Sequence, residues 1–179
     1  MGTDKGLIPI RGKRMIQYVI EAIQGEVQDV VIISGNSSYE KFGLMVIADR
    51  IKNQGPAGGV LTALEHARTE KILIAACDMP GLTTDAARFM ISKMDDGEIV
   101  IPVHHDISEP LFGIYSKSIV PQWKELVDKR INAMRELISY FDLHMEDVSN
   151  NQTFNSGLFN NINSKMDMEL LASKRNHEN

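Results

Sequence analysis

The sequence is poor in the residues on which several classes of protein depend. It has one cysteine, Cys77, among 179 residues, so neither an intrachain disulfide nor a metal cluster held by cysteines alone can form. No apolar run approaches the ~20 residues of a membrane-spanning helix, and the first residues lack the apolar stretch of a signal peptide. These absences argue against a disulfide-stapled secreted protein and a helical membrane protein, and they favour the reducing cytoplasm.

Positive charge is also scarce. Lys and Arg together number 19 and Asp and Glu number 24, which gives a net charge of −5. A mildly acidic chain offers no electrostatic footprint for duplex DNA or for an anionic membrane. We therefore expect residues 1–179 to form a single domain that binds neither nucleic acid nor membrane, with a frayed polar tail at 173–179.

The hydrophobic pattern along the chain alternates between one typical of buried strands and one typical of helices. Continuous apolar runs, typical of strands buried on both faces, occur at Val30–Ile33, Leu44–Ile47, Ile72–Cys77, Ile99–Val103 and Leu111–Tyr115, with a short one at Met145–Val148. Helical spacing falls at 16–23, 61–67, 87–94, 119–127 and 133–140, and a capping box at 164–167 opens a last helix. This alternation predicts an α/β fold with a mostly parallel sheet and helices on both faces.

In a sheet of this kind, ligands bind beyond the carboxyl ends of the strands. Asp78 follows Ile72–Cys77, the run with the strongest signal for burial, and the turn residues Pro80 and Gly81 come just after it. One or two carboxylates together with substrate phosphates suffice to bind magnesium, so Asp78 is the best candidate for a metal ligand. The competing interpretation is that Asp78 only caps the turn.

Other candidates carry weaker signals. Asp49 ends a neighbouring strand run, and Asn36 lies in a polar loop that suits either a nucleoside contact or an ordinary turn. Gly55 and Gly58 belong to a glycine-rich turn that opens a helix, where backbone N–H groups can meet an anion. Lys5 is a candidate phosphate ligand only through its context.

Two further features point away from catalysis. His104 and His105 are adjacent at a predicted strand end, so their side chains point to opposite faces and cannot chelate one metal together. Cys77 lies in an apolar run, which favours a small buried hydrophobe over a nucleophile.

Several segments, taken in order, resemble one known family. They are Met-Gly-Thr-Asp-Lys-Gly-Leu at 1–7, Ser-Gly-Asn at 34–36, Ala-Asp-Arg at 48–50, Gly-Pro-Ala-Gly-Gly at 55–59, Ala-Cys-Asp-Met-Pro at 76–80, Glu-Pro-Leu-Phe-Gly-Ile-Tyr at 109–115 and Phe-Asn-Asn-Ile-Asn at 159–163. The ordered set covers almost the whole chain and is similar to the molybdenum cofactor guanylyltransferases, within the nucleotidyltransferase superfamily of three-layer, Rossmann-like sheets.

The resemblance implies transfer of GMP from GTP to the phosphate of molybdopterin, with Mg²⁺ as cofactor and GTP as co-substrate. It implies that Asp78 binds magnesium and that Lys5 contacts the nucleotide phosphates. Asn36, Asp49, Gly55 and Gly58 would hold the guanosine part, and Glu109 would face the pterin. A molybdopterin-donating protein is a possible partner.

The family has a strand and a Leu-Ala-Gly-Gly-x-Ser-x-Arg loop immediately before the Met-Gly at which this sequence begins. We therefore expect a vacant place between central strands and weak activity of the 179-residue chain. The alternatives that stay open are cytidylyl transfer to molybdopterin, nucleotidyl transfer to a sugar phosphate, and a non-catalytic nucleotide-binding or partner-docking module.

Overall fold

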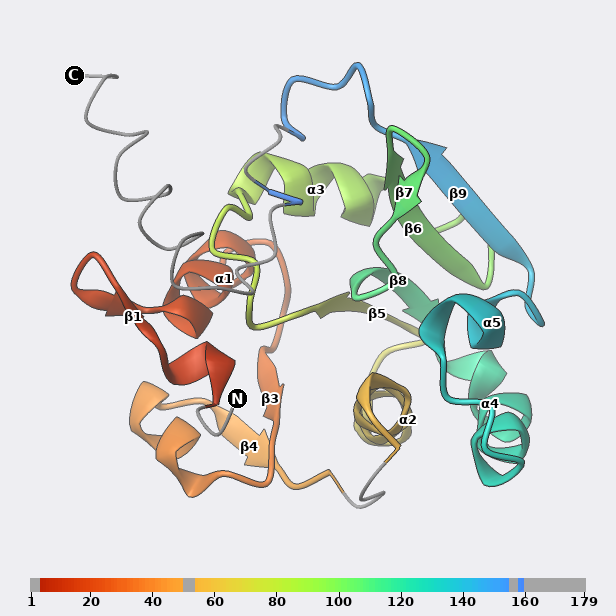
Figure 1. Cartoon of the computed structure of the whole chain (residues 1–179), viewed down its shortest axis with the longest axis horizontal. Helices are drawn as coiled ribbons and strands as arrows, with labels where there is room; N and C mark the ends of the chain where they lie inside the picture. Colours follow the sequence, from red (N-terminus) through yellow and green to blue (C-terminus); the bar gives the residue numbers. More distant parts are fainter. Residues whose placement is uncertain (1–3, 50–53, 155–157, 160–179) are drawn as a thin grey trace.

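The computed structural model describes residues 4–49, 54–154 and 158–159 (Figure 1). The first half contains η1 (Lys5–Leu7), β1 (Pro9–Ile10), β2 (Lys13–Arg14), α1 (Met15–Ile23), β3 (Val31–Ile33), η2 (Ser37–Phe42), β4 (Met45–Ile47), α2 (Pro56–His66) and β5 (Lys71–Ala75). The second half contains α3 (Thr84–Ser92), β6 (Ile99–His104), β7 (Ile107–Ser108), β8 (Phe112–Ser116), η3 (Lys117–Ile119), α4 (Val120–Asp128), α5 (Met134–Ile138) and β9 (Leu143–Asp147).

The strands form a mixed arrangement, so the prediction of a mostly parallel sheet is wrong. Pairs β3–β4 and β6–β9 are parallel, whereas β1–β2, β5–β8, β6–β7 and β6–β8 are antiparallel. The reason lies between β6 and β8, where His105 and Asp106 adopt positive φ angles of 48° and 64° and reverse the chain. A parallel return needs a crossover of about a dozen residues or more, which this connection does not provide.

The main sheet has the order β5-β8-β6-β7, with β9 also paired to β6, and β3–β4 forms a separate two-stranded sheet. Every residue of β8 is buried, whereas every residue of β5 is only partly buried. The expectation that the run at 72–77 is the most buried strand is therefore wrong. Among the described strands, β5 pairs only with β8 and β3 only with β4, so each keeps one edge without a strand partner.

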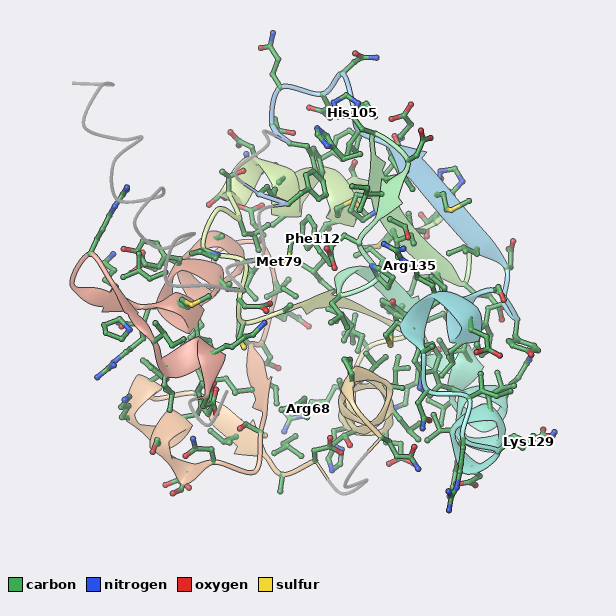
Figure 2. The ribbon with its side chains drawn as sticks, viewed as in Figure 1. Arg68, Met79, His105, Phe112, Lys129 and Arg135 are labelled. Carbon is green, nitrogen blue, oxygen red and sulfur yellow. The ribbon has the colours of Figure 1, made fainter. Side chains whose placement is uncertain are left out.

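Helices cover both faces of the main sheet, as predicted (Figure 1). Ile99 and Ile101 of β6 pack with Trp123 and the apolar faces of α2, α4 and α5. Val100, between them, packs on the other face with Phe112, which is labelled in Figure 2, and with residues of α1 and α3. This alternation follows from the period of two along a strand and gives the main sheet an apolar core on each face.

Two of the predicted helices have well-defined starts. Thr83 caps α3 by accepting a hydrogen bond from the Ala86 N–H at 3.2 Å, and Pro56 occupies the first turn of α2 after Gly55. The β1–β2 hairpin and β7 were not predicted. The predicted helix after Ser164 and the tail at 173–179 lie outside the described residues. No helix in the described part of the chain combines the length and apolarity that crossing a membrane requires.

Candidate nucleotide site

Lys5 and Asp78, far apart in the sequence, meet beyond the carboxyl end of β5. The Lys5 ammonium lies 3.1 Å from Asp78 Oδ2, and the two side chains are 38% and 18% exposed. Asp78 lies three residues beyond Ala75, the last residue of β5, so the strand ends two residues earlier than predicted. A partly buried carboxylate and an ammonium thus converge at the edge of the sheet where the sequence predicted a ligand.

Gly6 allows this meeting because the chain passes very close to Cys77. A Cβ at Gly6 would lie 3.1 Å from both Cβ and Sγ of Cys77 and would collide with the hydroxyl of Tyr39. Only glycine lets η1 approach the Cys77–Asp78 turn so closely. The residue after Lys5 therefore sets the position of the Lys5 backbone.

The residue before Lys5 is held by a polar network. Asp4 accepts a hydrogen bond from the Asn36 amide at 3.1 Å and another from the Tyr39 hydroxyl. Asn36 Oδ1 also accepts the Ser38 N–H at 3.0 Å and so caps η2. In this structure the Asn36 side chain therefore organises the loop that anchors Asp4 and Lys5.

Ionisation of the neighbouring groups is suppressed. Burial, followed by the hydrogen bond to Asp4, raises the pKa of the Tyr39 phenol far above its usual range, so Tyr39 remains a donor. Burial raises the pKa of the Cys77 thiol to about 11, and the negative charges of Asp78 and Asp4 add to the effect. Cys77 is thus a protonated thiol at neutral pH, which agrees with its predicted non-nucleophilic role.

A second group of predicted residues lies around the start of α2. The Thr62 hydroxyl lies 3.3 Å from Asp49 Oδ1 and 3.0 Å from the Gly58 carbonyl, which ties the end of β4 to the helix. Gly55 precedes α2 with φ of 58° and ψ of −150°, a conformation that favours glycine. The indole of Trp123 donates to the Ala57 carbonyl at 3.0 Å and fixes the first turn of α2.

Glu109 lies in the connection between β7 and β8. Its N–H donates to the Pro102 carbonyl at 3.1 Å, and its carbonyl accepts the Phe112 N–H at 3.1 Å. Because the Ala76 N–H donates to the Leu111 carbonyl at 2.8 Å, this connection runs beside the segment that leads to Asp78. The backbone that carries Glu109 is therefore joined, through Leu111, to the segment that leads to Asp78.

A surface hollow of about 510 Å³ opens at the carboxyl ends of β6 and β9. Its lining residues are Val103, His105, Asp106, Ser108, Met145, Asp147 and Ser149. Hydrogen bonds from the Ser149 hydroxyl and N–H lower the pKa of the Asp147 carboxyl, so this residue is ionised at neutral pH. The acidic lining suits hydrogen-bond donors better than phosphate groups.

The structure therefore sorts the predicted residues into three groups: Lys5, Asp78 and Asn36, then Asp49, Gly55 and Gly58, and finally Glu109. Sequence reasoning missed Asp4, Tyr39 and Thr62, which position these residues. The position of Asp4 directly before Lys5 and Gly6 could have indicated that it belongs to the site. Tyr39 and Thr62 had none, because their roles depend on contacts between separate elements.

Known proteins with similar sequences point to one family. Residues 1–147 match the sequence profile described as the MobA-like NTP transferase domain. A Flavobacterium johnsoniae protein named "Probable molybdenum cofactor guanylyltransferase" is 30% identical over 174 residues, covering 97% of this chain and 92% of that protein. The Yersinia pestis "Molybdenum cofactor guanylyltransferase" is 31% identical over 180 residues, covering 97% and 89%.

Solved structures agree in fold. The crystal structure of molybdopterin-guanine dinucleotide biosynthesis protein A from Archaeoglobus fulgidus has a TM-score of 0.81 at 23% identity, covering 97% of this chain and 92% of that one. The 2-C-methyl-D-erythritol 4-phosphate cytidylyltransferase from Thermus thermophilus has a TM-score of 0.73 at 12% identity, covering 96% and 94%. Both therefore share a mixed α/β nucleotidyltransferase fold with this protein. On its sequence match over residues 1–147, the chain belongs to the MobA-like NTP transferase family.

Proposed function

We propose that this protein is a molybdenum cofactor guanylyltransferase, which transfers GMP from GTP to the phosphate of molybdopterin and releases pyrophosphate. The observation that carries the proposal is the Lys5–Asp78 pair beyond β5, formed by two residues 73 positions apart. Relatives that bear this name match the chain over nearly their full length, and their names support the choice of substrates. Both observations therefore support nucleotidyl transfer at the Lys5–Asp78 pair.

The reaction places a largely electrostatic demand on the protein. A phosphate monoester has a second pKa near 6, so at pH 7 the acceptor is mostly a dianion and needs no general base. Its oxygen attacks the α-phosphorus of GTP, and the bond to the pyrophosphate oxygen breaks. Two anions must therefore approach each other while negative charge builds on the leaving group.

In the proposed reaction, the positive charge of Lys5 stabilises the negative charge of the phosphate groups. In the structure its ammonium forms an ion pair with Asp78 at 3.1 Å. When GTP binds, we expect Lys5 to turn from Asp78 toward the phosphates, because a triphosphate carries more charge than one carboxylate. Asp4 and Gly6, on either side of Lys5, keep its backbone in place during this exchange.

Asp78 is the residue that fits a magnesium ion. It is a partly buried carboxylate at a strand end, and magnesium prefers oxygen ligands from one or two carboxylates together with substrate phosphates. Bound there, magnesium would neutralise charge on the phosphates. The release of Asp78 from Lys5 would make a carboxylate oxygen available to the ion.

The remaining predicted residues suit the two substrates. Asp49, together with Gly55 and Gly58 at the start of α2, would hold the guanosine, and Asn36 would act mainly by anchoring Asp4. Glu109 would face the pterin, whose ring N–H groups suit a carboxylate acceptor. A protein that donates molybdopterin would be a natural partner.

The test is guanylyl transfer measured as pyrophosphate release and as formation of the dinucleotide, with GTP, molybdopterin and Mg²⁺. Asp78→Asn should lower the rate by a factor of about 10²–10³, or about 3–4 kcal/mol, as expected for loss of one preorganised electrostatic contact. Asp85→Asn is the matched control, because Asp85 is an exposed carboxylate whose ion pair with Arg88 lies on the surface of α3. Near-normal turnover by Asp78→Asn would contradict the proposed role of Asp78.

Nucleotide choice separates the alternatives. We expect titration with Mg²⁺ present to show binding of GTP in preference to CTP. Preference for CTP would indicate a cytidylyltransferase, and transfer to a sugar phosphate in place of molybdopterin would indicate a different acceptor. Absence of binding to either nucleotide would indicate a docking module.

A further inference from the structure

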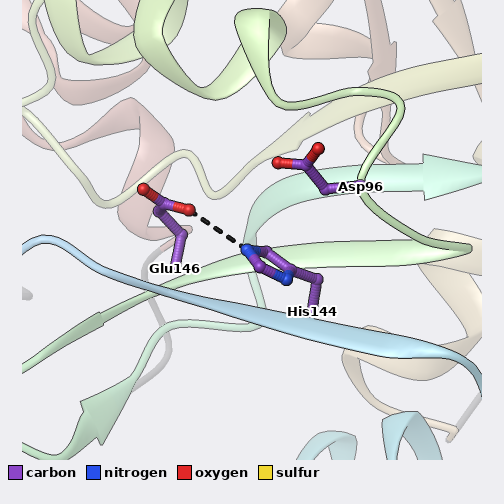
Figure 3. Close-up of side chains that lie close together, drawn as sticks. All are labelled: Asp96, His144 and Glu146. Atoms are coloured by element: carbon purple, nitrogen blue, oxygen red, sulfur yellow. Dashed lines mark hydrogen bonds and ion pairs between the residues drawn. The ribbon is translucent and has the colours of Figure 1, made fainter.

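A cluster of three potential metal ligands lies at the β9 edge of the main sheet. Asp96, His144 and Glu146 each place one ligand atom so that all three atoms lie within 4.8 Å of one another. Figure 3 shows the imidazole of His144 beside the carboxylate of Glu146, with Asp96 on the adjacent turn. Nothing in the proposed nucleotidyl transfer uses these residues.

Paired backbone fixes the positions of two of the three residues in the cluster. His144 and Glu146 are two residues apart on β9, so their side chains point to the same face. β9 pairs in parallel with β6 along its whole length, from Leu143 opposite Ile99 to Asp147 opposite Val103. The two ligands on β9 are therefore held at a fixed spacing.

Asp96 is brought to the same place by the turn between α3 and β6. Its N–H donates to the Lys93 carbonyl at 3.1 Å. The N–H groups of Glu98 and Ile99 both donate to the Asp142 carbonyl, at 3.0 and 3.1 Å, which fastens the turn to the start of β9. A Cβ at Gly97 would lie only 3.1 Å from that same carbonyl, so glycine lets the two segments approach closely.

The two oxygens of Glu146 are used differently. Oε1 lies 3.1 Å from the Lys93 ammonium, and Oε2 lies 3.1 Å from Nε2 of His144. The Glu146 carboxylate is therefore oriented through Oε1 by Lys93, with Oε2 facing the imidazole.

We propose that Asp96, His144 and Glu146 bind a Zn²⁺ ion that links the α3–β6 turn to β9. The metal would take the place of the proton between Nε2 of His144 and Oε2 of Glu146, and water would fill the remaining positions. A hydrogen-bonded partner such as Lys93 is what a ligating carboxylate commonly has in metal sites. Imidazole with carboxylates suits zinc and other first-row transition ions, whereas magnesium prefers oxygen ligands alone.

The geometry favours a reversible, accessible site. The His144 side chain is 40% exposed, so an ion can reach it from solvent, while Glu146 is only 18% exposed. The ligands come from two segments that are separated in the chain by β6, β7, β8, η3, α4 and α5. A bound ion would therefore stabilise the outer edge of the sheet by closing a long loop.

The experiment is titration of the tag-free 179-residue chain with ZnCl₂ by calorimetry, repeated with CoCl₂ to record the visible absorption of the bound ion. We expect one equivalent of Zn²⁺ to bind and to raise Tm, because the ion binds the folded state. His144→Gln and Asp96→Asn should each weaken binding at least about tenfold, and the cobalt absorption should weaken in parallel.

Three control variants test whether zinc binds at this cluster or elsewhere on the protein. Asp95→Asn removes the carboxylate next to Asp96, and His105→Ala removes a histidine outside the cluster, so both should retain binding. Asp78→Asn should also retain it, since that residue belongs to the proposed magnesium site. Unchanged affinity in both His144→Gln and Asp96→Asn, or loss of binding in Asp78→Asn, would overturn the proposal. Because none of these readouts uses guanylyl transfer, they are independent of the proposed function.

Discussion

Two regions of the molecule are held together by different forces. The N-terminal layer, residues 4–49, contains short strands with exposed apolar side chains, such as Val31 at 41% and Met45 at 56%. The main sheet contains β8, which is buried along its whole length between the two apolar cores. The first region combines two small apolar clusters, one around Met15 and one around Ile16 and Ile32, with specific polar contacts, whereas the second depends mainly on two larger apolar cores.

The polar contacts of the N-terminal layer converge on Lys5 and its neighbours. Asp4 binds Asn36 and Tyr39, Lys5 binds Asp78, and the Arg14 guanidinium donates to the Leu7 carbonyl at 2.6 Å. Segments with fewer buried apolar contacts open at lower free energy, and binding loops are commonly drawn from them. Changes in this layer should therefore affect ligand binding more than global stability, and changes in the main sheet should do the reverse.

The largest expected effect on stability is that of Gly113→Ala in β8. A Cβ at Gly113 would lie 2.5 Å from the Val100 carbonyl oxygen and 2.9 Å from Cγ2 of Ile101. A backbone carbonyl in a paired strand cannot move aside, so we expect a loss of about 3 kcal/mol of unfolding free energy. Urea denaturation measures this loss, with Gly25→Ala as the control because no atom beyond the adjacent residues lies within 4 Å of a Cβ there. A loss below about 1 kcal/mol would show that β8 can shift over β6.

The second prediction concerns Gly6→Ala in the N-terminal layer. The new Cβ would push against Cys77 and the Tyr39 hydroxyl, and the relief of that contact must displace η1 with Lys5. We expect the Kd for GTP to rise roughly thirtyfold, or about 2 kcal/mol, while the unfolding free energy falls less than in Gly113→Ala. Calorimetric titration and urea denaturation of the same sample compare the two quantities. If stability fell as far as in Gly113→Ala while GTP affinity stayed unchanged, the contrast between the regions would be wrong.

The sequence predicts where the elements lie better than how they pair. Runs such as Val30–Ile33 and Leu111–Tyr115 became strands within one residue of β3 and β8, because hydrophobic period is a local property. The antiparallel return through His105 and Asp106 escaped prediction, since neither residue is glycine and their dipeptide is not a common hairpin turn. Strand direction depended on two positive φ angles that nothing in the local pattern indicates.

The candidate site shows the same limit. The position of Asp78 after a buried run follows from the general rule for α/β sheets, and Lys5 was named through the family resemblance. The pairing of Lys5 with Asp78, and the anchoring of Asp4 by Tyr39, join elements from separate parts of the chain. Contacts of this kind require the tertiary structure.

The third prediction tests the group of residues around α2. Asp49→Ala removes the carboxylate that lies 3.3 Å from the Thr62 hydroxyl and that we propose contacts the guanosine. A nucleoside contact acts similarly in the ground state and the transition state, so KM for GTP should rise about tenfold, or about 1.4 kcal/mol, with kcat little changed. Thr62→Val is the matched variant, because it removes the hydroxyl and keeps the carboxylate. A collapse of kcat at constant KM would instead place Asp49 beside the metal.

The smallest expected effect is a pH dependence of stability caused by Cys77. Burial, with the charges of Asp78 and Asp4, raises the pKa of this thiol from 9.0 to about 11 in the folded protein. Between these two pH values the folded chain keeps a proton that the unfolded chain has released, so stability is complete below pH 9 and falls as pH rises toward 11.

From pH 9 to pH 10 this thiol should lower the unfolding free energy by about 1 kcal/mol. Cys77→Ala removes that contribution. The buried phenol of Tyr115 remains in both proteins and cancels in the difference, and Tyr39 keeps the burial and the Asp4 hydrogen bond that contribute most to its raised pKa. Urea denaturation of both proteins at pH 8, 9 and 10 should therefore show the stability of Cys77→Ala declining less steeply, and parallel curves would mean that the thiol reaches solvent and that the contact between η1 and the Cys77–Asp78 turn is looser than the structure shows.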